Sequence, residues 1–110
     1  MAQYSDVFID QGSSYSATIP VLKSNGLPLD LSGYIARGQI RRNYTSSAYI
    51  DFIAAIVDAE GGLITISLTP TQTASLKPGR HMFDVEVATV GDLDVKRVSE
   101  GQIHITPRVT

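Results

Sequence analysis

The residues best suited to chemistry in this chain are two histidines, His81 and His104. Both lie in segments where apolar and polar residues alternate, a period of two that is typical of β-strands. His81 shares a predicted strand face with Phe83 and Val85, which favours a buried structural histidine over a catalytic or metal-binding one. His104 is expected to face solvent, and no HExxH or comparable ligand spacing occurs.

Carboxylates occur in two close pairs. Asp84 and Glu86 are expected on one strand face, and Asp92 and Asp94 flank a predicted turn. Calcium sites use such oxygen ligands, but two carboxylates without an Asp-rich loop favour a solvated face. The chain also has no nucleophile-elbow pattern and no phosphate-cradling glycine loop. We therefore expect a protein that is not an enzyme and that binds no cofactor or metal.

Composition limits the classes of protein that fit. The 110 residues, 43% hydrophobic and 18% charged, are expected to form one globular domain over residues 1–110. A net charge of −2 gives no reason to expect nucleic-acid or membrane partners. There is no cysteine, and the N-terminal residues lack the basic and apolar regions of a secretory signal.

Residues 63–87 carry the strongest structural pattern: strand, one-turn helix, tight turn, strand. Thr69 is suited to cap a helix, Pro70 to occupy its first position, and Gln72 to complete a capping box. Pro78 disfavours helical geometry at the residue before it, which limits the helix to residues 70–76.

Strands are expected almost everywhere else, and they are predicted over residues 4–9, 14–23, 34–43, 49–58, 63–69, 81–87, 93–99 and 102–107. A bulge is expected at Glu100-Gly101. In 34–43 the small residues Ala36 and Gly38 face inward, which indicates a bulky neighbour. The pattern favours an all-β, immunoglobulin-like antiparallel β-sandwich of seven or eight strands with one short helix, over a small barrel.

Two surface features could bind a partner. Arg37, Arg41 and Arg42 make a basic stretch on one predicted strand. It is expected either to guard an edge against mispairing or to dock an acidic neighbour. The loop 43–49 carries Tyr44 and Tyr49, which suit a binding loop, although a plain solvent loop is also compatible.

Three ordered segments resemble a known family. DLSGYIARGQIRR (30–42), GGLITISLTPTQTASLKPGRHMFDVEV (61–87) and VSEGQIHITPRVT (98–110) are similar to the N-terminal domain of phage baseplate upper proteins. The resemblance implies a non-enzymatic virion structural protein of a tailed bacteriophage, assembled in the host cytoplasm. It would act as a tail or baseplate adaptor or a decoration protein, in oligomeric contact with other virion proteins.

A virion module of this kind would act through apolar anchors and strand edges. The candidate contact residues are Tyr4, Phe8, Arg37, Arg41, Arg42, Tyr44 and Tyr49. Residues 1–12 are a candidate interaction arm that would pair with a neighbouring subunit, with residues 11–14 as its hinge. The alternative is a carbohydrate-binding β-sandwich module, which the absence of tryptophan disfavours.

Overall fold

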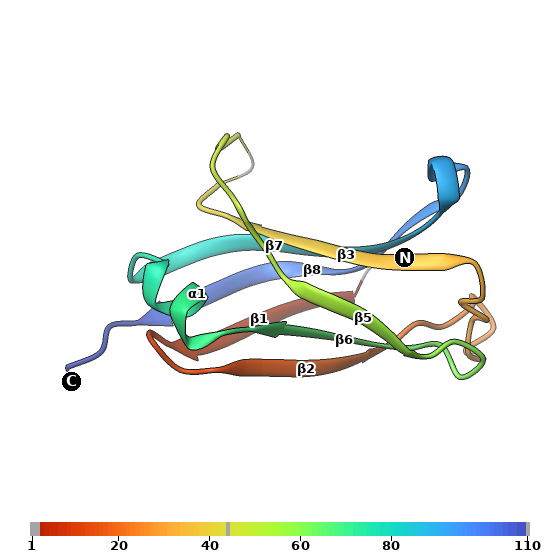
Figure 1. Cartoon of the computed structure of the whole chain (residues 1–110), viewed down its shortest axis with the longest axis horizontal. Coiled ribbons are helices and arrows are strands. Elements are labelled where there is room, and N and C mark those ends of the chain that lie inside the picture. The colour runs from red at the N-terminus through yellow and green to blue at the C-terminus, as the bar shows by residue number, and fades with distance from the viewer. Residues whose placement is uncertain (1–2, 44, 110) are drawn as a thin grey trace.

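The chain forms two facing β-sheets in a computed structural model that describes residues 3–43 and 45–109 (Figure 1). One sheet has the strand order β1-β8-β7-β3-β4 and the other β2-β6-β5. The strands are β1 Gln3–Asp10, β2 Tyr15–Pro20, β3 Tyr34–Arg41, β4 Ile50–Asp51, β5 Ile53–Asp58, β6 Leu63–Leu68, β7 Gly79–Thr89 and β8 Val95–Thr106. The described residues also form α-helix α1, Pro70–Ser75, and the 3₁₀ turn η1, Val90–Asp92. The predicted all-β sandwich of seven or eight strands with one short helix is confirmed.

One strand pair departs from the antiparallel pattern that was predicted. β1 runs parallel to β8, with eight register pairs from Gln3 opposite Ser99 to Asp10 opposite Thr106. Ile9 of β1 is buried in the core. In this structure residues 3–10 therefore belong to the sheet of their own domain, and their pairing with a neighbouring subunit stays a prediction.

The turn after β1 is fixed rather than free. The Thr73 hydroxyl of α1 accepts the backbone N–H of Gly12 at 3.0 Å and lies 2.7 Å from the carbonyl oxygen of Ser13. The Gln11 side-chain amide donates to the Leu76 carbonyl at 3.0 Å. Thr73 is fully buried, so these bonds are shielded from water. The segment expected to act as a hinge is thus attached to the helix.

α1 begins as the sequence predicts. Thr69 caps it by accepting the backbone N–H of Gln72 at 3.1 Å, and the Gln72 side chain accepts the Thr69 N–H at 2.9 Å. Pro70 occupies the first turn. The helix ends at Ser75, one residue before the predicted end, because Leu76 adopts extended backbone angles and its side chain is buried.

The single strand predicted over 49–58 is two strands. β4 pairs with β3 in the larger sheet, and β5 pairs with β6 in the smaller one. Phe52 lies at the crossing, where its N–H donates to the Gly38 carbonyl at 2.9 Å and its ring packs edge-on against Phe83. A methyl group on Gly38 would lie 3.0 Å from the Phe52 ring, which confirms the predicted bulky neighbour.

β8 is one continuous strand, so the predicted break at Glu100-Gly101 is wrong. The register shift lies at Val98, because Val85 pairs with Ser99 and Glu86 with Arg97. Gly101 has another role. Its φ of 150° and a Cβ position only 1.8 Å from the Ser5 carbonyl oxygen show that β1 approaches where a side chain would stand.

Candidate interaction surface

Side chains of four strands project from the side of the five-stranded sheet that faces away from the smaller sheet. We call this side the outer face. The register of β1, β8, β7 and β3 and the alternation of burial define its members. They include Tyr4, Asp6, Phe8, Arg37, Gln39, Arg41, Met82, Asp84, Glu86, Arg97, Glu100, Gln102 and His104. The face therefore collects four of the predicted contact residues: Tyr4 and Phe8 on the edge strand, and Arg37 and Arg41 on the strand nearer the other edge.

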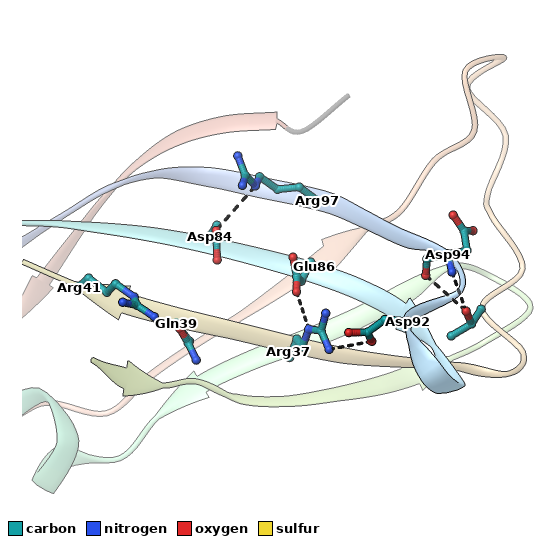
Figure 2. Close-up of polar contacts among 9 residues, drawn as sticks. Arg37, Gln39, Arg41, Asp84, Glu86, Asp92, Asp94 and Arg97 are labelled. Carbon is teal, nitrogen blue, oxygen red and sulfur yellow. Dashed lines mark hydrogen bonds and ion pairs between the residues drawn. The ribbon is translucent and has the colours of Figure 1, made fainter. Parts of the chain in front are cut away.

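Ion pairs join oppositely charged side chains near the centre of the outer face (Figure 2). The Arg37 guanidinium donates to the Glu86 carboxylate across the β3–β7 pair, and its Nη1 lies 3.2 Å from Asp92 in η1. Hydrogen bonding to Glu86, and then to Asp92, raises the pKa of Arg37. Exposed pairs of this kind stabilise the fold little. They do fix the positions of the charges that a partner would meet.

Arg97 on β8 forms the second set of contacts. Its guanidinium lies 3.7 Å from Asp84 and 3.3 Å from Glu100. Partial burial raises the pKa of Asp84, although the charge of Arg97 acts in the opposite direction. The nearby positive charge of Arg97 thus only partly offsets the cost of removing the Asp84 carboxylate from water.

The β7–β8 hairpin carries a further polar link. The Tyr34 hydroxyl donates to Asp94 at 2.5 Å, and Lys96 lies 3.5 Å from the same carboxylate. The Tyr34 hydrogen bond, and then the charge of Lys96, lowers the pKa of Asp94.

The four carboxylates weighed as calcium ligands, Asp84, Glu86, Asp92 and Asp94, each face a cation. Among the described residues no group of three or more His, Asp or Glu side chains could hold a metal ion.

Two aromatic side chains stand out from the edge strand β1. Tyr4 is 58% exposed and Phe8 is 73% exposed. The Phe8 ring stacks on His104 with ring centres 4.8 Å apart, and the His104 imidazole lies 3.8 Å from Asp6. His104 thus faces outward as predicted, and its stacking holds Phe8 against the sheet.

The remaining contact candidates lie at the end of the sandwich near α1. The Arg41 guanidinium lies 4.9 Å from the centre of the Tyr49 ring. Arg42 lies 3.5 Å from the ring of His81, which is buried and hydrogen-bonded through Nε2 to the Lys77 carbonyl at 2.8 Å. Tyr44 falls outside the described residues.

Sequence reasoning missed the contribution of Lys77 to this end of the molecule. Lys77 lines a cleft with Arg41, Arg42, Tyr49 and His81. Thirty-five positions of chain separate Lys77 from Arg42, so their meeting depends on the pairing of β3 with β7 and on the turn after α1. The only local signal was Pro78, which favours extended backbone at Lys77 and so ends the helix before it.

Comparisons with known proteins add little to this geometry. No protein-family model matches the chain, and no curated protein matches it. Among solved structures, a family 123 glycoside hydrolase from Clostridium perfringens is similar over 96% of this chain, with a TM-score of 0.44 and 11% identity. This chain spans 23% of that enzyme's length, and a likeness this weak does not bear on function. The described residues include no helix long and apolar enough to cross a membrane.

Proposed function

We propose that this chain is a non-enzymatic structural protein of a bacteriophage virion, a tail or baseplate adaptor or a particle decoration protein. It acts through contacts with other virion proteins, and its aromatic edge strand supplies one of the contact surfaces. The resemblance of residues 30–42, 61–87 and 98–110 to the phage domain supports this proposal. These segments contain β3, β6, α1 and most of β7 and β8.

The observation that carries the proposal is the exposure of Tyr4 and Phe8 on β1. In the described sheet β1 pairs only with β8, so its other edge has backbone groups without a strand partner. Large exposed aromatic side chains beside an open strand edge are typical of surfaces that bind another protein. Tyr4 and Phe8 lie on the same face, four positions apart along the strand, so one partner surface would contact both.

Purified particles of the phage that encodes the chain test this proposal. We expect the protein at a fixed copy number per particle, by quantitative mass spectrometry. Changing Tyr4 and Phe8 together to serine should leave a folded protein that particles incorporate poorly. Leu93, which is 90% exposed in the β7–β8 hairpin, provides a matched control, and Leu93→Ser should be incorporated normally.

The proposal would be wrong if intact particles lack the protein. Normal incorporation of the Tyr4 and Phe8 variant would instead remove β1 from the contact surface. A polysaccharide pull-down tests the carbohydrate-binding alternative in parallel. Retention on a polysaccharide that depends on Tyr4 and Phe8, combined with absence from particles, would favour that alternative.

A further inference from the structure

A cleft of about 380 Å³ lies at the end of the sandwich near α1. It opens between the β3–β4 connection and the turn that joins α1 to β7, two segments that Figure 1 shows at the same end of the molecule. Its walls carry the cations Arg41, Arg42 and Lys77 and the rings of Tyr49 and His81, and the buried side chains of Ile40 and Leu76 contribute to it. No Asp or Glu is among its lining residues in the described part of the chain.

The cations of this cleft differ from Arg37, Lys96 and Arg97 in their partners. Over residues 3–43 and 45–109, ion pairs join Arg37, Lys96 and Arg97 to carboxylates. None joins Arg41, Arg42 or Lys77 to one. Carboxylates thus pair directly with cations at the centre of the sheet and at the β7–β8 hairpin, whereas among the described residues the cleft cations have no direct carboxylate partner and Arg41 acts on Asp84 only at longer range.

Arg41 is held in place without a carboxylate. Its Nη1 donates to the Ser46 carbonyl at 2.6 Å, and its Nη2 donates to the Gln39 side chain at 2.9 Å. The Tyr49 ring, 4.9 Å away, covers the guanidinium. A guanidinium fixed by neutral groups keeps its charge and some of its N–H donors for a ligand, and little further ordering is needed on binding.

Among the described residues, Arg42 has no acceptor at a good hydrogen-bond distance. Its Nη1 lies 3.5 Å from the Pro78 carbonyl and 3.5 Å from His81 Nε2. His81 Nε2 is 2.8 Å from the Lys77 carbonyl, and a carbonyl can only accept, so this nitrogen carries a hydrogen. It therefore cannot accept from Arg42. The remaining contact is at the limit of hydrogen-bond length and weak.

A larger cleft, of about 560 Å³, lies near the start of β8 but has a different character. Its cations, Lys96 and Arg97, are ion-paired, and Glu100 lies in its own lining. An anion would have to displace carboxylates already present. The cleft near α1 has no such competitor among the described residues.

We infer that the cleft near α1 receives an acidic segment of a partner protein. A carboxylate would bind between Arg42 and Lys77, since a guanidinium matches a carboxylate in a two-point hydrogen bond and an ammonium adds a second positive charge. An apolar neighbour of that acidic residue would pack against Tyr49 and the Ile40–Leu76 floor. This apolar floor favours a peptide over a free inorganic anion. The inference rests on the proposed function, because it identifies one of the protein contacts.

Titration of the isotope-labelled full chain with a synthetic peptide of alternating leucine and glutamate tests the inference, with a leucine–glutamine peptide for comparison. We expect the glutamate peptide to shift the NMR signals of Arg42, Lys77 and His81. The double variant Arg42→Gln, Lys77→Gln should weaken binding about tenfold. The control is Lys23→Gln with Lys96→Gln, which removes the same charge from exposed sites outside the cleft. Melting curves confirm that both variants fold.

Three results would overturn the inference: equal binding of the two peptides, equal loss of affinity in the two double variants, or the same shifts with inorganic phosphate at equal concentration. The titration needs no phage particle, so its failure leaves the proposed function to be decided by particle composition. Conversely, a protein absent from particles that still binds the glutamate peptide would refute the proposed function alone.

Discussion

The Tyr34 hydroxyl donates to the Asp94 carboxylate at 2.5 Å and so joins two segments 60 positions apart in the chain. Tyr34 begins β3, and Asp94 precedes β8 in the hairpin after β7. The same hairpin is closed by the Asp94 backbone N–H, which donates to the Thr89 hydroxyl at 2.9 Å. One residue therefore fixes both the shape of the hairpin and its position beside β3.

This link makes stability depend on pH. The folded pKa of Asp94 lies below its unfolded value, mainly because of Tyr34, so its ionised form stabilises the fold at neutral pH and the contribution is lost in acid. We expect Asp94→Asn to lower the melting temperature at neutral pH, and the difference from wild type to shrink below about pH 4. Asp10→Asn, on the exposed end of β1, is the control. A difference that stays constant down to the most acidic pH tested would contradict this.

Asp84 should behave in the opposite way. Burial raises its folded pKa, so the carboxyl favours the fold most in acid, and this contribution falls as the pH rises through the folded pKa. We expect Asp84→Asn to raise the melting temperature at neutral pH and to have little effect below about pH 4. Glu86→Gln, two residues along the same strand face, removes the negative charge that faces Arg37 and should lower the melting temperature slightly. A lower melting temperature for Asp84→Asn at neutral pH would refute this assignment.

At Thr73, the loss of the buried hydroxyl should affect stability more than the change in helix propensity does. Thr73→Val keeps the shape of the side chain but leaves the Gly12 N–H and the Ser13 carbonyl without this partner. We expect a loss of about 1–3 kcal/mol in the free energy of unfolding, measured in urea. Thr73→Ser, which keeps the hydroxyl, should lose less. If the two variants were equally stable, the hydroxyl would not fix the turn.

Gly101 should be required for the attachment of β1. A methyl group there would stand 1.8 Å from the Ser5 carbonyl oxygen, so Gly101→Ala should displace β1 and speed amide hydrogen exchange across β1. Gly91→Ala is the control, because Gly91 also has a positive φ of 76° but has nothing within 4 Å. Unchanged exchange in β1 for Gly101→Ala would show that the strand tolerates the side chain.

Much of the fold could be predicted from the sequence because its determinants are local. The alternation in 63–69 and 81–87 places side chains on two faces of a strand, and Thr69 and Gln72 form their capping box within one turn of chain. The parallel partner of β1 could not be predicted in this way. β1 can pair with β8 because Gly101 has no side chain at the place where the Ser5 carbonyl lies. These two residues are almost one hundred positions apart in the chain.

The candidate site was predictable only in part. Alternation placed Arg37 and Arg41 on one outward face, but it could not show that Arg37 meets Glu86 and Asp92 while Arg41 meets neutral groups. That difference is set by the cross-strand register and by the path of the β7–β8 hairpin. The strand expected over 49–58 likewise gave no sign of changing sheets at Phe52, because an apolar run over residues 53–57 follows it without a turn signal.

The shared direction of β1 and β8 has a mechanical consequence. Gln3 lies beside Ser99 and Asp10 beside Thr106, so tension between residue 3 and residue 106 would drag the two strands past each other lengthwise. The backbone hydrogen bonds of the whole ladder would then bear load together instead of opening one by one from an end. We expect a high rupture force along this axis in single-molecule stretching, and a lower one when handles at Gly79 and Thr106 peel β7 from β8. A domain built in this way would resist load along this axis more strongly than load that separates β7 from β8.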